Sequence, residues 1–476
     1  DAGVDVSAEL LRLFEQLTGS LLQKVGMFLQ ARQHRHQALR WTDWRQLAAV
    51  TDRALHEIEV LHTCQLGRLG PDEPAAAARA RPDICGGLRG TLRTQTRLVV
   101  EAFHQHSLAQ VQSSVEQERW ERTDVPQAYR QLLEHMLGGS ERPEAAQAAG
   151  ADGQEPDKHV RVGGVKFLAV PAILVLIQIL HEYVQLSHEW SSCARDIALG
   201  MVYLLRHFNQ QVHKMVLGGQ AVHSQTLKKI TAMHLGLCCQ CLVFMEKLLP
   251  HLQQLLHAIL GKQSTPGGES SLVEVVDGFA KVVAEYADHR QALLNKLSDL
   301  LCLSFKSHAS RWLGAAHSEL TADAASQLAE AGAGSGAAEG IDLHPHAAME
   351  GIVRDVAGMH TVLQKLLGAD HVKKVFIKAF SDIAAVFGQQ LGGGLAAPSP
   401  PYSDKLGSSL GDRLAMDIAF LHEQLGKKLA GITTPLEHLL ADLLHHLQTK
   451  LPEDDLVRHP HRPVLEALRR LGRLPQ

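Results

Sequence analysis

The residues with the clearest metal-binding chemistry are His234, Cys238 and Cys241. Their spacing of four and then three residues places the three side chains on one face of a helix. Imidazole and thiolate groups bind zinc, but no fourth ligand with matching spacing is evident. The same face carries Leu227, Ile230 and Met245. Because cysteine is among the most frequently buried residue types, we predict a buried apolar stripe here, with a helical metal-dependent enzyme as the lesser alternative.

Two other segments imitate catalytic motifs. His181–Gln185 begins like the His-Glu-x-x-His helix of zinc proteases, but a glutamine stands where the second imidazole ligand is needed. Gly407–Gly411 matches the Gly-x-Ser-x-Gly nucleophile elbow, which requires a preceding strand and an α/β sheet. This segment instead opens an amphipathic helical pattern. We therefore predict a protein that is not an enzyme, with no catalytic, cofactor-binding or metal-binding residues and no cofactor.

A row of arginines suggests a different kind of site. Arg89, Arg93 and Arg97 recur every four residues on one predicted helix. The apolar stripe beside them consists of Leu88, Leu92, Val99 and Phe103. Such a row is able to bind acidic lipid headgroups or an acidic protein, although it more often indicates a solvated helix face. We predict a membrane or partner surface at these three arginines.

The elements that must position these residues are helices. The chain has 476 residues, of which 45% are hydrophobic and 5% aromatic, and its net charge is near −4. Alternating strand patterns are nearly absent, and the best candidate for an extended piece is His159–Val165. The near-neutral charge argues against a nucleic-acid partner, and seven scattered cysteines favour a reducing, cytoplasmic compartment. We predict an all-α fold, an elongated stack of helical bundles with no sheet.

The apolar run Phe167–Leu180 is a candidate membrane anchor. A spanning helix needs roughly 20 apolar residues, and this run is shorter and contains Pro171 and Gln178. We predict a helix buried inside a bundle instead.

A second local prediction concerns Gly218 and Gly219, which separate two helical patterns and form a structural turn.

Amphipathic patterns and breaks rich in glycine and proline organise the rest of the chain. Helices are predicted at Ala8–Leu29, Asp43–Leu66, Leu88–Trp120, Ser191–Leu217, His223–Leu260 (bent or restarted at Pro250), Leu272–Ala316, Ala347–Leu367, His371–Leu391, Lys405–Ala430 and Pro435–Leu451. The predicted domains are a helical module at 1–137, a linker at 138–158, a central module at 159–261, a helical segment at 271–331, a linker at 332–345, a bundle at 346–451 and a basic tail at 452–476. Because the first residue is Asp1 rather than Met, we expect the C-terminal part of a longer protein.

Several short segments contain more specific combinations of residues. They are Glu118-Arg119-Trp120 with Asp124-Val125-Pro126, Phe208-Asn209, Val216-Leu217-Gly218 with Ala221, and Leu227-Lys228 with Ile230-Thr231 and Leu235. Further matches are Met349, Ile352, Met359-His360, Leu363 and Asp417–Leu421. In this combination the chain resembles the family of vacuolar protein sorting-associated protein fifty-four, over most of residues 88–430. The family's glycine turn usually reads Gly-Ala-Gly, where this chain has Gly218-Gly219-Gln220.

The resemblance implies a function without catalysis. Members of this family are subunits of the Golgi-associated retrograde protein complex, which captures endosome-derived carriers at the trans-Golgi network. The implied partners are the other subunits, bound mainly through an N-terminal region that this sequence does not contain, together with SNARE proteins and the endosomal or carrier membrane. The implied location is the cytoplasmic face of trans-Golgi network and endosome membranes. The alternative is a subunit of the endosome-associated recycling complex or of an exocyst-like tether.

Overall fold

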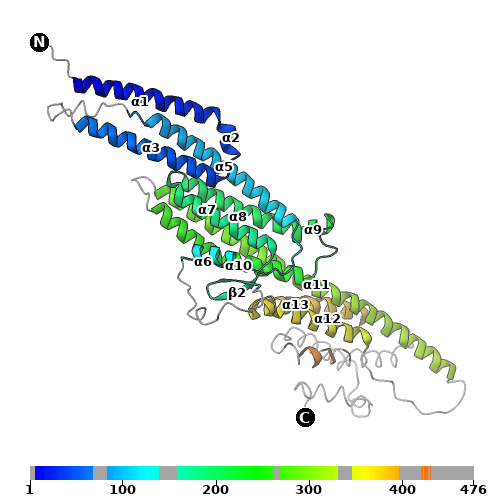
Figure 1. Ribbon diagram of the computed structural model, residues 1–476. Helices are drawn as coiled ribbons and strands as arrows, with labels where there is room; N and C mark the ends of the chain where they lie inside the picture. The colour runs from blue at the N-terminus through cyan, green and yellow to red at the C-terminus, as the bar shows by residue number, and fades with distance from the viewer. Residues whose placement is uncertain are drawn as a thin grey trace, which may run out of the picture. The chain divides into compact units, whose positions relative to one another are not determined.

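The computed structural model describes residues 6–67, 83–138, 158–261, 269–330 and 346–395, with a few more between 417 and 429 (Figure 1). Nearly all regular structure in this part of the chain is helical, so the all-α prediction is confirmed in the main. The chain divides into two compact units. The first comprises residues 1–118, 124–212 and 247–285, and the second comprises residues 119–123, 213–246 and 286–476.

The prediction that the chain contains no sheet is wrong. Strands β1 (His159–Val162) and β2 (Val165–Leu168) form an antiparallel hairpin in which Val160 lies opposite Phe167. The turn residues Gly163 and Gly164 have φ of 56° and 71°. Positive φ at both central residues of a two-residue loop is the geometry that matches the twist of paired strands. The extended pattern was visible in the sequence, but its pairing partner lay inside the run predicted as helix.

The N-terminal part of the first unit is built on helix α5 (Gly86–Glu116). Helices α1 (Val6–Ala31) and α3 (Trp41–Gly67) both pack on α5, and the short α2 (Gln33–Gln37) precedes α3 (Figure 1). Trp44 is fully buried and donates from its indole nitrogen to Thr96 Oγ1 at 3.1 Å, so α3 is fixed to α5 by a satisfied polar contact inside an apolar core.

The helix predicted to be buried is α7 (Pro171–Glu189), which packs on α5 and on α6 (Gln127–Met136). Leu176, Ile177 and Leu180 have no exposed surface, and this confirms a core helix. The helix begins at Pro171, where the missing amide proton costs no hydrogen bond. The preceding residues of the apolar run belong to β2 and a short connection.

Three long helices contribute residues to both units: α8 (Ala194–Val216), α10 (Ala232–Gly261) and α11 (Glu269–Glu330). Of the bend or restart predicted at Pro250, the restart is wrong, because α10 is continuous through this residue. Of the helices that the structure describes, α10 alone is long and apolar enough to cross a membrane, and 61% of its most apolar window is buried inside the protein. That burial is typical of a core helix.

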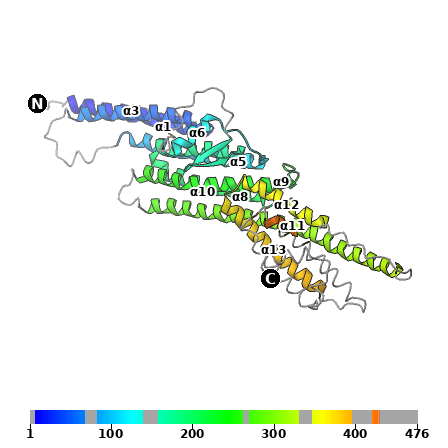
Figure 2. The same cartoon turned by 90° about the horizontal axis from the view of Figure 1, so that it is seen from below.

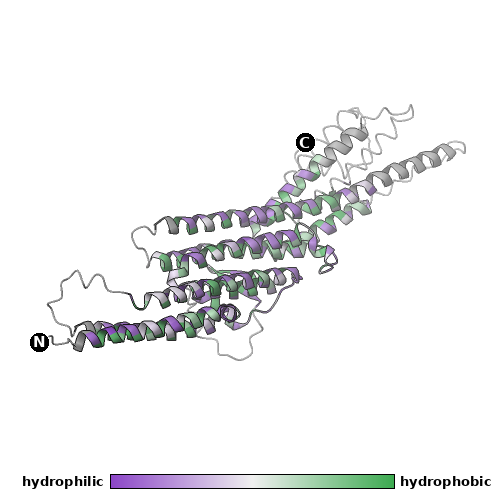
Figure 3. Cartoon of the chain, turned by 90° about the horizontal axis from the view of Figure 1, so that it is seen from above, coloured by the Kyte–Doolittle hydropathy of each residue, from purple (hydrophilic) through white to green (hydrophobic). Residues whose placement is uncertain are grey.

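In the second unit, α12 (Ala347–Gln364) packs against α13 (Ala369–Leu395) (Figure 2). The His360 ring of α12 lies edge-on to the buried Phe376 of α13, with 5.3 Å between the ring centroids. Helix α11 is joined to α13 where Ser298 Oγ donates to the Val375 carbonyl oxygen at 2.9 Å. Hydrophilic and hydrophobic residues alternate along these helices, as expected for amphipathic elements (Figure 3). The predicted linkers and basic tail lie essentially outside the described residues, as do Pro435–Leu451 and most of Lys405–Ala430.

Candidate interaction surfaces and helix junctions

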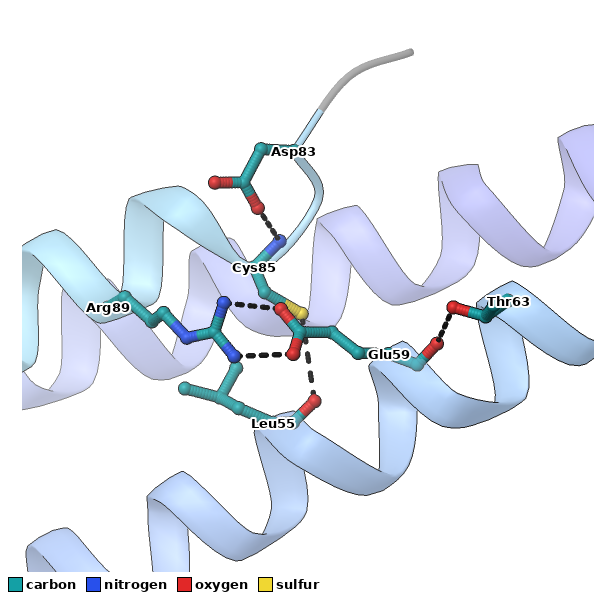
Figure 4. A network of polar contacts seen from close by, with 6 residues as sticks. All are labelled: Leu55, Glu59, Thr63, Asp83, Cys85 and Arg89. Atoms are coloured by element: carbon teal, nitrogen blue, oxygen red, sulfur yellow. Dashed lines mark hydrogen bonds and ion pairs between the residues drawn. The ribbon is translucent and has the colours of Figure 1, made fainter. Parts of the chain in front are cut away.

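The arginine row on α5 is not uniform. Arg89 forms a two-pronged ion pair with Glu59 of α3, and its Nη2 donates to Glu59 Oε2 at 2.5 Å (Figure 4). The hydrogen bond with Arg89 holds the pKa of the Glu59 carboxyl below its usual value. At the same junction Cys85 is fully buried, and its thiol points to the Leu55 carbonyl oxygen at 3.9 Å. Arg89 therefore joins two helices, and its charge is largely neutralised.

The other two arginines of the row, Arg93 and Arg97, are exposed. The apolar stripe beside them faces the protein, because Leu88, Leu92 and Val99 are buried among the helices of the first unit. A surface that uses this row consequently offers two free-standing guanidinium groups rather than three. It has no apolar stripe available to insert into a membrane.

The glycine turn links α8 to the one-turn helix α9 (Gln220–His223), and its two glycines act for different reasons. A Cβ on Gly218 would lie 2.5 Å from the Lys214 carbonyl oxygen, so the close backbone approach requires glycine. Gly219 caps α9 with φ of 72°, a left-handed conformation that costs other residues energy. Both predicted glycines thus occupy positions where a side chain is disfavoured.

The predicted buried stripe at Cys238 and Cys241 is confirmed, and Cys239 is buried with them. Burial raises the pKa of the Cys239 thiol to about 12, so the reactive thiolate form is disfavoured. His234 lies at the start of α10, where its Nδ1 accepts from the Thr231 amide at 3.3 Å and Thr231 Oγ1 accepts from the His234 amide at 3.4 Å. This reciprocal pair resembles a capping box with histidine in place of glutamate. In the described part of the chain, no group of three or more histidine, cysteine or carboxylate side chains is placed to hold a metal.

Sequence reasoning missed the most informative carboxylate, Glu118. Its side chain is buried, and Oε2 accepts from the Ala172 amide at 2.7 Å in the first turn of α7. A carboxylate at this position satisfies an amide that has no partner within the helix and interacts favourably with the helix dipole. Glu118 carries part of the resemblance, but its partner is 54 residues away and no local pattern identifies it.

A second junction in the first unit joins α8 to α11. Asn209 Nδ2 donates to the Glu285 carbonyl oxygen at 3.2 Å, and Arg206 pairs with the Glu285 carboxylate through contacts of 2.6 and 3.1 Å. Phe208, between them in sequence, is buried. The segment Arg206–Asn209 therefore holds two helices together, with one side chain in the core and two at its edge.

A third junction brings α5, α7 and α8 together around Tyr183. Its hydroxyl lies 2.5 Å from His104 Nδ1, and Gly200 of α8 is so close that a Cβ there would approach His104 Nδ1 to 3.3 Å. Burial lowers the pKa of His104 and raises that of Tyr183, so both side chains are held in their neutral forms. The arrangement is a satisfied polar contact in a core and has the chemistry of a structural joint.

Comparison with known proteins agrees with the resemblance predicted from the sequence. Residues 164–302 match the family model described as Vps54-like protein. Vacuolar protein sorting-associated protein 54 of Rattus norvegicus is 28% identical over 232 residues, which cover 48% of this chain and 23% of the rat protein. The proteins of that name from Homo sapiens and Drosophila melanogaster are 27% and 25% identical, covering 45% and 48% of this chain and 22% and 23% of their own lengths. The matched part thus spans about a quarter of these relatives. No solved structure matches.

Proposed function

Because this chain carries a Vps54-like region at residues 164–302, we propose that it is a non-catalytic subunit of a multisubunit vesicle-tethering complex. In this proposal the complex captures endosome-derived carriers at the trans-Golgi network during retrograde transport. The chain would act at the cytoplasmic face of trans-Golgi network and endosome membranes. The observation that carries the proposal is the agreement between the family match and relatives named vacuolar protein sorting-associated protein 54 in animals and plants.

The geometry supports a role in assembly rather than in catalysis. In the segments that resemble the family, polar side chains cap or join helices, among them Glu118, Asn209 and Thr231. The buried titratable groups described above are held neutral or paired with neighbouring helices. Such residues stabilise a scaffold whose outer surfaces bind partners, and this is the chemistry that a tether subunit requires.

Membrane contact is a further part of this proposal. Arg93 and Arg97 are exposed on α5, and each arginine near an anionic lipid surface contributes about 1 kcal/mol. Two such residues supply about 2 kcal/mol, which assists membrane binding but does not anchor a protein. We infer that selective recruitment depends on protein partners, among them the other tether subunits and SNARE proteins.

Affinity capture of the full-length protein from its own cells, read by mass spectrometry, tests the proposal. We expect the other subunits of the retrograde tethering complex in stoichiometric amounts. A matched variant with Leu176→Asp in the core of α7 should lose them, while an exposed change on the same helix, Gln178→Asp, should retain them. Recovery of exocyst subunits, or of subunits specific to the endosome-associated recycling complex, would contradict the assignment.

A further inference from the structure

In the described part of the chain, most of the exposed large apolar side chains lie on α1 and α3. Leu17 of α1 and Val50 of α3 are 72% and 67% exposed. Those that recur at helical spacing form one stripe on each helix. The stripes consist of Leu10, Leu13, Leu17, Leu21 and Phe28 on α1 and of Leu47, Val50 and Leu61 on α3. We call the two stripes together the α1/α3 face.

The two stripes lie on the same side of the helix pair. Phe14 and Glu15 of α1 contact His62 of α3, and the Glu15–His62 distance is 2.8 Å. Gly26 of α1 and Leu55 of α3 instead lie against α5. At 100° per residue, going round either helix from its α5 side to its contact with the other helix and onward in the same sense leads to its exposed stripe. The α1/α3 face is therefore continuous across both helices and points away from α5.

Both stripes follow a seven-residue repeat. The positions seven residues apart are Leu10, Leu17 and Lys24, then Leu21 and Phe28, on α1, and Leu47, Ala54 and Leu61, then Val50 and Glu57, on α3. Helices with this repeat pack lengthwise against other helices that share it. The pattern therefore fits a third helix that lies along the line where α1 and α3 meet.

The size of the face matches that of a stable protein interface. Its eight large side chains, about half exposed on average, leave on the order of 800 Å² accessible, which equals the area per partner in a standard interface. Isolated exposed leucines are ordinary, but a contiguous apolar patch of this size marks an interaction site.

Lys24 stands within the apolar stripe of α1, and its charge selects the partner. Because the Glu15–His62 contact aligns the two antiparallel helices, Lys24 lies at the same level as Arg53 of α3. Both side chains are exposed, and neither has an ion-pair partner among the described residues. A second copy related by a two-fold axis parallel to the helices brings these like charges together. A helix of a different chain is able to place carboxylates at this level instead.

The remaining charges suit a protein better than a lipid surface. Glu9 on α1 and Asp43 and Glu57 on α3 are exposed within or beside the stripes. A helix that lies on anionic lipid carries a predominantly basic polar border, so acidic residues in these places oppose that use.

We propose that the α1/α3 face binds an amphipathic helix of a different protein, which lies along the line where α1 and α3 meet. The bound helix carries apolar side chains at a seven-residue repeat. It also carries a carboxylate, within or beside its apolar stripe, at the level of Lys24 and Arg53. The face holds this helix by burying apolar anchors every three to four residues and by pairing the two cations. The proposal concerns this surface alone and holds whichever complex the chain belongs to.

Site-specific photocrosslinking of the full-length protein in its own cells tests the proposal. A photoreactive phenylalanine analogue replaces Ala54, at the middle of the face, or, as the control, Ala49 on another side of α3. We expect an adduct from position 54 alone, and mass spectrometry should map it to an amphipathic helical segment of a different protein with the carboxylate described above. Leu17→Glu and Leu61→Glu should each abolish the adduct. An adduct with a second copy, with another part of the same chain, with lipid or with a segment that lacks these features overturns the proposal, as does the absence of any adduct.

A synthetic peptide of the crosslinked segment measures the affinity. In fluorescence anisotropy with the 476-residue chain, Leu17→Glu and Leu61→Glu should each raise the Kd by about 100-fold, as loss of a central apolar contact does. Gln23→Glu and Ala49→Glu introduce the same side chain at exposed positions on other sides of the same helices and should leave the Kd unchanged. Circular dichroism confirms that all four variants are folded. Equal binding by all of them overturns the proposal.

A charge exchange tests the role of the two cations. Changing Lys24 and Arg53 together to Glu should weaken binding of the peptide several-fold. A peptide in which the facing carboxylate is replaced by lysine should bind this double variant more tightly than it binds wild type. The same order of affinities for the two peptides with both proteins overturns the proposed pairing.

Discussion

At the scale of single residues, most of the polar side chains that stand out act by satisfying a neighbouring helix. Glu118 accepts an amide of α7, Asn209 donates to a carbonyl of α11, and Thr231 with His234 closes the start of α10. The amides of Ala172, Thr231 and His234 lie at helix starts, where the helix itself offers no acceptor, and a buried group left without a partner costs about 1–3 kcal/mol. Asn209 instead adds a second donor to a carbonyl inside α11. The segments that resemble the family are thus explained by structure as much as by function.

Replacing Glu118 with Ala should lower the free energy of unfolding by about 1–3 kcal/mol, because the buried Ala172 amide loses its acceptor. Urea denaturation followed by circular dichroism measures this difference. Glu121→Ala, an exposed change three residues away, is the matched control and should have little effect. Equal stability of the two variants would show that water or another group replaces the carboxylate.

The buried His289 predicts a loss of stability in acid. Burial, reinforced by the neighbouring His213, lowers the pKa of His289 to about 4. The unfolded chain, with an ordinary histidine pKa near 6.5, therefore binds more protons than the folded chain between about pH 6.5 and about pH 4. Stability falls as the pH falls through this window, by at most about 3 kcal/mol from this group. Urea denaturation at about pH 7 and at about pH 4.5 measures the decrease in the free energy of unfolding across most of this window. This decrease should be smaller in His289→Gln than in wild type. His257→Gln, at an exposed position, should show the same decrease as wild type.

At the scale of elements, helical periodicity predicted most of what the structure contains. The predicted helices near α1, α3, α12 and α13 are present because their apolar residues recur at helical spacing, and α7 is present as a run that is apolar on most sides. Two features escaped prediction for identifiable reasons. The hairpin was missed because the apolar residues of β2 run directly into α7, and the cap from Glu118 was missed because it depends on a contact distant in sequence. The spacing that predicted the arginine row could not show that Glu59 neutralises Arg89, because Glu59 lies on a different helix.

The glycine turn allows a graded test. Gly219→Val should destabilise the protein by about 1–2 kcal/mol, because φ of 72° is costly for a residue with a Cβ and more so for a branched one. Gly219→Asn should be better tolerated, since asparagine adopts this conformation more readily. Gly218→Val should also destabilise, through the clash with the Lys214 carbonyl oxygen. Thermal melting of the 476-residue chain measures all three, and identical melting temperatures for Gly219→Asn and Gly219→Val would contradict the conformational argument.

The core position of α7 gives the largest expected effect. Leu176→Asp places a carboxylate without a partner among fully buried apolar side chains, and we expect loss of soluble, folded protein. Gln178→Asp, exposed on the same helix, should express and fold normally. Recovery of both variants as soluble protein with native circular dichroism would mean that the helix does not form the core.

At the scale of the whole molecule, the proposed membrane contact is weak and electrostatic. Co-sedimentation with acidic liposomes should decrease when Arg93 and Arg97 are both changed to Glu, and the difference should shrink as salt rises because the charges are screened. Arg354→Glu, an exposed change on α12, is the single-site control. Equal sedimentation of wild type and the double variant at low salt would assign the row to an ordinary solvated helix face.

The composition of the first compact unit has a consequence for synthesis on the ribosome. This unit gathers residues from three separate stretches of chain, the last of which ends at residue 285. A nascent chain therefore cannot complete it until the N-terminal part of α11 has emerged, long after α1 and α3. During that interval the side of α8 that packs on α11, where Val202 lies against Gly278, lacks its later partner and invites chaperones or misassembly. Chains truncated before residue 247, where the last stretch begins, should accordingly aggregate even though they retain α1 to α8 intact.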